Sequence, residues 1–103
     1  MAKYRKKPVI IDAWQFNGWE GKSNHETWSD DVPDWIVEAE VIHGMAQPGQ
    51  VRRVVTSGNI QTLEIYTAEG IMTAQVADWI IRGVQGELYP CKPDIFAQTY
   101  EAA

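Results

Sequence analysis

The residue types best suited to binding a ligand gather near the end of the chain, in the string DWIIRGVQGELYPCKPDIFAQTY at residues 78–100. The candidate ligand contacts in this string are the cations Arg82 and Lys92, the aromatic ring of Tyr89 and the carboxylate of Asp94. Guanidinium and ammonium groups bind anions, as do the free N–H groups at a helix start, and an aromatic face stacks on a planar ring. The string therefore predicts a pocket for a small anion such as a nucleotide.

A structural interpretation of the same side chains is also open. Arg82 would pair with an acidic residue, Lys92 would be solvated, and Asp94 would only cap the following helix. Pro90 and Pro93 fix two backbone φ angles at about −65° on either side of Lys92. The Lys92 ammonium would therefore lose less freedom on binding a ligand.

The sequence contains no recognisable catalytic motif. Cys91 with His25 or His43 would make a thiol–imidazole pair, but nothing in the spacing brings these residues together, and we expect Cys91 to be a packing residue. One Cys and two separated His give no metal-ligand spacing, and the eight Gly form no phosphate-binding loop. We therefore predict a non-enzymatic protein with no metal and no cofactor. The alternative is a nucleotide-processing enzyme that uses Asp12, Asp78 or Asp94.

Two strands, two turns and a helix are expected to position the C-terminal residues. Residues 76–78 predict a turn, 79–82 a strand, 85–86 a tight turn and 87–89 a second strand, and a helix follows. The two-residue period of a strand puts Trp79 and Ile81 on one face and Arg82 on the other. The apolar residues expected to hold the last strand and helix onto the sheet are Trp79, Ile81, Ile95 and Phe96.

Near the N-terminus, residues 8–16 are rich in β-branched and aromatic side chains and predict a strand. Both faces of this strand carry apolar groups, so we expect it to be central or covered on both sides. Gln15 then needs a polar partner, which makes it a candidate ligand contact. Residues 17–30 predict a long loop. Its Trp19 and Trp28 either anchor the loop or form part of a lid over a ligand or a partner surface.

A helix is predicted to begin near Pro33 and to run to residue 41 or 42, with Asp31 as its N-cap and Gly44 as its stop. Its helical spacing turns Trp35, Ile36 and Ala39 toward the sheet and Glu38 and Glu40 outward. His43 is expected to complement the C-terminal end of this helix.

Three further strands are predicted at residues 51–55, 60–67 and 71–75, with turns at 57–59 and 68–70. The complete order is one strand, a helix, five strands and a helix. It predicts an α+β fold, with a small, curled, mostly antiparallel sheet of five or six strands and two helices. The chain is expected to form a single domain over residues 1–103.

Charge and composition exclude several classes of partner. Fourteen acidic residues outweigh nine basic ones, for a net charge of −5, which disfavours duplex nucleic acid. The basic cluster Lys3, Arg5, Lys6 and Lys7 is interpreted as a solvated lead-in. One Cys cannot form an intrachain disulfide, and no apolar run approaches the roughly 20 residues of a membrane span. We therefore expect a cytoplasmic protein with no membrane partner.

Three segments resemble a family of small proteins that phages and prophages encode and that is named for a PGDYG-like motif. They are YRKKPVIIDAWQF, PDWIVEA and, above all, DWIIRGVQGELYPCKPDIFAQTYE. At the naming motif the chain has VADWI, residues 76–80, where the family has Pro-Gly-Asp-aromatic-Ile. Pro-Gly suits the centre of a type II turn, in which Gly supplies a positive φ. Val76 and Ala77 do not adopt that conformation cheaply, so we expect a type I or looser turn.

The resemblance implies a phage origin and a small accessory protein without established catalytic residues. Together with the anion-binding residue types, it suggests a sponge that sequesters a nucleotide-type immune signal and thereby counters host defence. The alternative is an interaction module that grips a host or virion protein through the loop of Trp19 and Trp28. A sponge often has its pocket between subunits, so we expect a homo-oligomer. The predicted ligand-binding residues are Gln15, Trp28, Arg82, Tyr89, Lys92 and Asp94.

Overall fold

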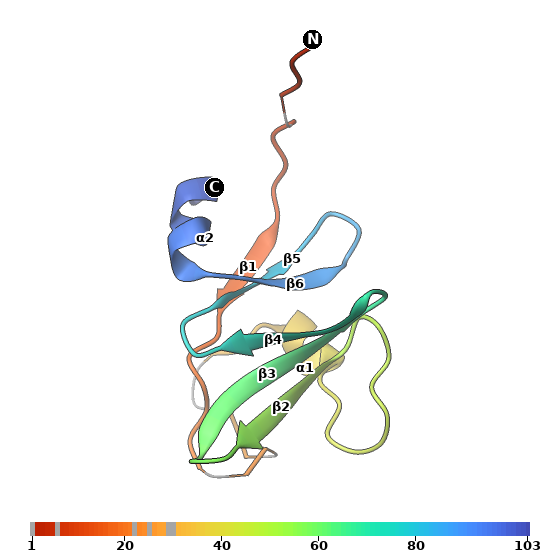
Figure 1. The fold of residues 1–103 in the computed structure, drawn as a ribbon, viewed down its shortest axis with the longest axis vertical. Coiled ribbons are helices and arrows are strands. Elements are labelled where there is room, and N and C mark those ends of the chain that lie inside the picture. Colours follow the sequence, from red (N-terminus) through yellow and green to blue (C-terminus); the bar gives the residue numbers. More distant parts are fainter. Residues whose placement is uncertain (1, 6, 22, 25, 29–30) are drawn as a thin grey trace.

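The fold has α+β architecture, which confirms the predicted class (Figure 1). The structure is a computed structural model that describes residues 2–5, 7–21, 23–24, 26–28 and 31–103. Within these ranges the elements are, in chain order, β1 (Asp12–Gln15), α1 (Asp34–Ala39), β2 (Val51–Thr56), β3 (Ile60–Thr67), β4 (Gly70–Gln75), β5 (Trp79–Arg82), β6 (Leu88–Cys91) and α2 (Pro93–Thr99).

The strands form two antiparallel three-stranded sheets rather than one curled sheet. One sheet has the order β1-β5-β6 and the other the order β2-β3-β4, and β6 contacts β3 and β4. The main core draws side chains from both sheets, from α1 and from the loop after β1. Its buried members are Phe16, Trp19, Ile36, Val51, Leu63, Ile65, Ala74, Ile80 and Leu88. As the alternation in β3 predicts, Leu63 and Ile65 point inward.

The first strand is shorter than predicted and lies at a sheet edge, so of the two expected positions the central one is wrong, while Ala13, Trp14 and Gln15 are partly buried. Among the described strands its partner is β5, with a register that runs from Asp12 opposite Arg82 to Gln15 opposite Trp79. Because a strand needs a hydrogen-bonded neighbour, β1 extends no further than the four residues that β5 offers. The preceding residues stretch away from the body of the molecule (Figure 1), and Ile10 is 80% exposed there.

The first helix is also shorter than predicted, because the chain leaves it to pair with β2. Pro33 occupies the N-cap position, so the prediction of Asp31 as the cap is wrong. Glu40 is extended and forms a parallel bridge with Val51, and the Val41 N–H donates to the Val51 carbonyl at 2.8 Å. The helix thus ends well before residues 43 and 44, which neither complement nor stop it.

The second helix contacts β5 through a pair of stacked rings. Trp79 and Phe96 stack with their ring centroids 4.0 Å apart and an interplanar angle of 5°, as expected of residues that join strand to helix. Ile95, in contrast, is 53% exposed and does not pack as predicted. The preceding strand, β6, extends to Cys91, two residues beyond its predicted end. Pro90 is tolerated within it because β6 is an edge strand, where a missing N–H can face away from the ladder.

Candidate functional site

Lys92 is bound by the buried carboxylate of Asp78, at the start of β5. Its Nζ lies 2.9 Å from Oδ2 and 3.2 Å from Oδ1 of that carboxylate. Oδ2 also accepts the Gln75 N–H at 2.9 Å. The Asp78 side chain is only 5% exposed, so a ligand that withdrew Lys92 would leave a buried charge without its counter-ion. Lys92 is therefore the counter-ion of a buried carboxylate, although its own side chain is 53% exposed and also contacts solvent.

The turn before β5 has a positive φ at a residue other than glycine. Ala77 has φ 83°, and the Asp78 N–H donates to the Gln75 carbonyl at 3.0 Å, which is the pattern of a type II turn. The expectation of a type I or looser turn is therefore wrong. Backbone bonds between Phe16 and residues 77–78 hold this turn, and Gln15 Nε2 donates to the Ala77 carbonyl at 3.0 Å. Gln15 thus has a structural partner.

Arg82, at the other end of β5, pairs with Asp12 directly across the sheet. Its Nη2 and Nε lie 2.6 and 3.1 Å from the same carboxylate oxygen, and its guanidinium carbon lies 5.3 Å from the centroid of the Trp35 ring. The two side chains of the ion pair are 39% and 55% exposed. Solvent screens such a pair, which contributes about 0–1 kcal/mol, so an anion can compete for Arg82. A hollow of about 370 Å³ lies beside it, lined by residues 10–12, 82–84 and 86.

Tyr89 lies on the opposite face of the sheet from Arg82, because it pairs with Ile81 in the register of β5 and β6. Its hydroxyl is 3.4 Å from that of Tyr100, just beyond α2. Burial, and next the bond to Tyr100, raise the pKa of Tyr89 to about 12. Asp94 is exposed in the first turn of α2 and forms no side-chain capping bond. Neither residue joins Arg82 in a site.

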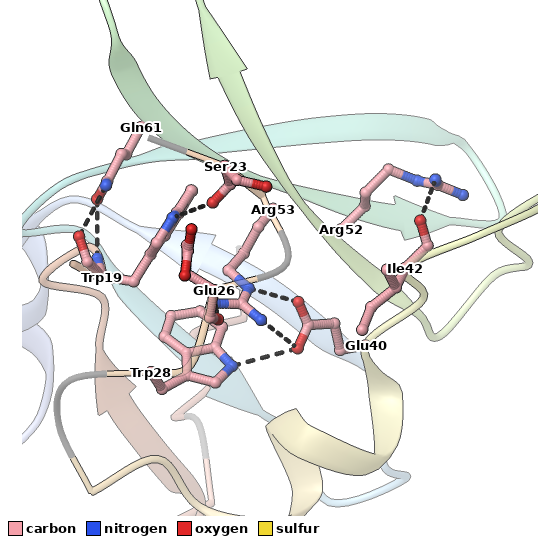
Figure 2. A network of polar contacts seen from close by, with 9 residues as sticks. All are labelled: Trp19, Ser23, Glu26, Trp28, Glu40, Ile42, Arg52, Arg53 and Gln61. Carbon is pink, nitrogen blue, oxygen red and sulfur yellow. Dashed lines mark hydrogen bonds and ion pairs between the residues drawn. The ribbon is translucent and has the colours of Figure 1, made fainter. Parts of the chain in front are cut away.

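The most buried cation of the described residues, Arg53, is not among the predicted site residues. Arg53 is 3% exposed, and its guanidinium forms a two-point ion pair with Glu40, at 2.5 and 3.2 Å (Figure 2). It also donates to the Glu26 carbonyl. The guanidinium carbon lies 4.2 Å from the Trp28 ring centroid and 5.4 Å from that of Trp19. This cage stabilises the interior, and the prediction that Glu40 faces outward is wrong.

The sequence does contain a signal for this cage. Arg53 alternates with Val51 and Val55 in β2, so it shares their inward face. A cation at an inward position needs a carboxylate nearby, because an unpaired buried charge is strongly unfavourable. The carboxylate that pairs with Arg53 is that of Glu40, the first residue after α1. Its side chain points inward because the helix ends earlier than the sequence predicts.

Both tryptophans of the loop after β1 are anchored to the core. Trp19 is 6% exposed and exchanges two hydrogen bonds between its backbone and the Gln61 side chain, at 2.7 and 2.8 Å (Figure 2). Its indole N–H donates to the Ser23 carbonyl at 2.7 Å. The Trp28 indole N–H donates to Glu40 at 3.2 Å. The described part of this loop is thus anchored, as one of the two interpretations expects.

The six predicted ligand-binding residues consequently do not converge on one pocket. Gln15 and Lys92 both bind the turn before β5, Gln15 through a backbone carbonyl and Lys92 through the Asp78 carboxylate. Arg82 lies at the other end of β5. The others lie elsewhere: Tyr89 on the opposite face, Trp28 in the arginine cage, and Asp94 on the surface.

A hollow with a mostly apolar lining lies between the chain before β1 and α2. We call it the aromatic groove. It encloses about 350 Å³ and is lined by residues 9–11, 13, 79, 96 and 100–103. Trp79, Phe96 and Tyr100 form a row of stacked rings, with successive centroids 4.0 and 5.1 Å apart. Glu101 is the one charged residue among those that line it, so the groove offers apolar surface rather than an anion site.

The described residues assemble little catalytic chemistry. Burial raises the pKa of the Cys91 thiol, and the nearby carboxylates of Asp78 and Asp94 raise it further, so the thiol is protonated at neutral pH. His43 is exposed, and His25 lies outside the described residues. No group of three or more His, Cys, Asp or Glu that could hold a metal occurs in the described ranges. Neither described helix has the length and apolar character needed to cross a bilayer.

No family model, curated protein or solved structure matches the chain. Its function is therefore inferred from the grooves, charges and contacts of the molecule itself.

Proposed function

We propose that this protein is a non-enzymatic binding protein that takes an apolar segment of a partner polypeptide into the aromatic groove. The observation that carries this proposal is the row of three stacked rings facing the exposed side chains of Val9 and Ile10 across an open hollow. Contiguous exposed apolar surface of this kind marks interaction sites, and aromatic residues are enriched at their centres.

Charge supports a polypeptide over a small anion as the main ligand. The two buried carboxylates, of Glu40 and Asp78, hold the cations Arg53 and Lys92, and the aromatic groove carries a glutamate at its rim. A basic side chain on the partner would pair with Glu101 while an apolar neighbour enters the groove. Because the sequence resembles a phage-encoded family, we propose that the partner is a host or virion protein.

The proposal is tested by selecting peptides from a displayed random library on the wild-type protein. The same library is then depleted on Ile10→Asp, a change at an exposed groove residue. We expect surviving peptides to share an aromatic or aliphatic anchor and to bind Ile10→Asp at least tenfold more weakly. Met45→Asp is the matched control, because Met45 is 86% exposed and lies outside the groove. Equal binding to all three proteins would refute the groove as the site.

A second candidate function is capture of a small anion at Arg82, in keeping with a sponge for a nucleotide-type signal. The supporting observation is the weak, exposed pair of Arg82 with Asp12 beside a hollow of about 370 Å³. An anionic group would replace Asp12 on the guanidinium, and Trp35 would remain beneath it. This hollow does not include Lys92.

Thermal shift and calorimetric titration separate the two candidates. Cyclic dinucleotides, ADP-ribose and inorganic pyrophosphate are the probes. If the anion site operates, one of them raises the melting temperature of the wild type but not of Arg82→Ala, and Lys92→Ala retains the affinity. The recovered ligand is expected to be chemically intact, because the Cys91 thiol is protonated and therefore a weak nucleophile. An altered ligand would instead indicate an enzyme.

A further inference from the structure

Opposite charges are separated along this chain, and among the residues that the structure describes Lys3, Arg5 and Lys7 form no ion pair with an acidic side chain. Four of the nine basic residues lie between positions 3 and 7, whereas all fourteen acidic residues follow them. The basic residues belong to the N-terminal arm, which we define as described residues 2–5 and 7–11. The arm forms no helix or strand and stretches away from the body (Figure 1). Its apolar members Tyr4, Val9 and Ile10 are 93%, 51% and 80% exposed.

A second groove on the body has the complementary character. This acidic groove, of about 880 Å³, is lined by residues 48–49, 66–72 and 85–89. Glu69 and Glu87 are exposed on opposite sides of it, and no lysine or arginine is among its lining residues. Its apolar wall includes Ile71, which is 58% exposed, and Met72, which is 44% exposed.

The backbone around the acidic groove can also accept an extended segment. The groove lies between β4 and β6, each of which is an edge strand of its sheet. An edge strand has N–H and C=O groups free on one side, and an added strand can bond to them. Such an added strand presents its side chains alternately to the two sides. Tyr4 and the basic Lys3 and Arg5 of the arm would thus reach the apolar wall and the glutamates in turn.

We propose that the acidic groove receives the N-terminal arm of a second copy of this chain, and that two copies exchange their arms reciprocally. The arm's charge, its extended form and its exposed Tyr4 match what the groove offers. Its own body holds it elsewhere: residues 9–11 line the aromatic groove beside α2, from which the arm leads away. A reciprocal exchange closes a twofold dimer and leaves no arm unpaired. This inference does not depend on the proposed function of the aromatic groove.

The test uses two charge-reversed full-length proteins and light scattering after size exclusion. The arm variant carries Lys3→Glu, Arg5→Glu and Lys7→Glu, and the groove variant carries Glu69→Lys and Glu87→Lys. All five side chains are exposed, so both variants are expected to fold, which circular dichroism checks. We expect the wild type to have twice the 11.7 kDa monomer mass at low salt, and each variant alone to be a monomer.

Mixing the two monomeric variants is the decisive step. The acidic arm then meets a basic groove and the basic arm meets an acidic groove, so a heterodimer should form with both junctions restored. If each arm instead occupies its own groove, the wild type is a monomer and the mixture stays monomeric, which overturns the proposal. A wild-type dimer that both variants retain would also overturn it, because the interface would then lie elsewhere.

Discussion

The Nε atom of Arg53 lies 2.5 Å from a carboxylate oxygen of Glu40, and the two side chains are only 3% and 8% exposed. The pair joins the first residue after α1 to the middle of β2. It therefore fixes the short helix against the sheet and holds the Arg53 guanidinium against the Trp28 ring.

Removing one member of this pair should be costly. Glu40→Gln leaves the Arg53 guanidinium buried without its counter-ion, so we expect a loss of about 3–5 kcal/mol of unfolding free energy in urea titration. The control Arg82→Ala breaks an exposed pair and should cost about 1 kcal/mol or less. Replacing both members, as Glu40→Leu with Arg53→Met, should restore part of the loss. Equal costs for Glu40→Gln and Arg82→Ala would contradict the assignment.

Ala77→Gly should stabilise the protein. Ala77 has a φ of 83°, a conformation that costs an L-residue about 1–2 kcal/mol and costs glycine little. Part of that gain is offset because glycine gives the unfolded chain more freedom, so we expect a net rise of up to about 1 kcal/mol. Ala68→Gly, at an exposed turn position without a positive φ, should lower the unfolding free energy instead. A lower denaturation midpoint for Ala77→Gly would show that the turn is unstrained.

The two polar residues that flank Pro93 should differ sharply in their effect on stability. Lys92→Met removes the counter-ion of the buried Asp78 carboxylate and should cost about 1–3 kcal/mol, the scale of an unsatisfied buried group. Asp94→Asn changes an exposed side chain without a capping bond and should be nearly neutral. Chemical denaturation of both variants checks this. The prediction fails if they unfold at the same denaturant concentration.

Stability at high pH should depend on Tyr89. Its pKa is raised to about 12 in the folded protein, against about 10 for an unfolded chain, so folding favours the neutral phenol. This contribution is fully present below pH about 10 and is lost as the pH rises through about 12. We expect Tyr89→Phe to lose less stability than the wild type over that range, measured by urea titration at several pH values. Parallel losses would indicate that other groups govern alkaline unfolding.

Tyr66 offers a comparison for the same measurement. Its pKa is raised first by the hydrogen bond to Glu64, at 2.8 Å, and then by burial. Tyr66→Phe should therefore also reduce the loss of unfolding free energy at high pH. It should do so without altering the contact of Tyr89 with Tyr100. Spectroscopic titration of tyrosinate in both variants distinguishes the two phenols.

Local patterns were sufficient where the structure depends on neighbours in sequence. β3 and β5 have their predicted bounds, because β-branched alternation and short turns with Gly specify hairpins locally. The stacking of Trp79 on Phe96 likewise follows from a strand and a helix joined by a short connection. By contrast, the residues of the predicted ligand site lie apart, because side-chain alternation puts Arg82 and Tyr89 on opposite faces of the sheet and the buried Asp78 carboxylate pairs with Lys92.

The sequence by itself determined the α+β class, the order of the elements and the charge imbalance between the first residues and the rest, since all of these depend on composition and local periodicity. Only the tertiary structure decided where β1 and α1 end, and therefore which residues near those ends are buried. Pairing with a four-residue β5 ended β1 early and left the N-terminal arm exposed, and pairing with Val51 ended α1 early and turned Glu40 inward to Arg53. Partners distant in sequence set those limits, because strand pairing and charge burial are satisfied across space rather than along the chain.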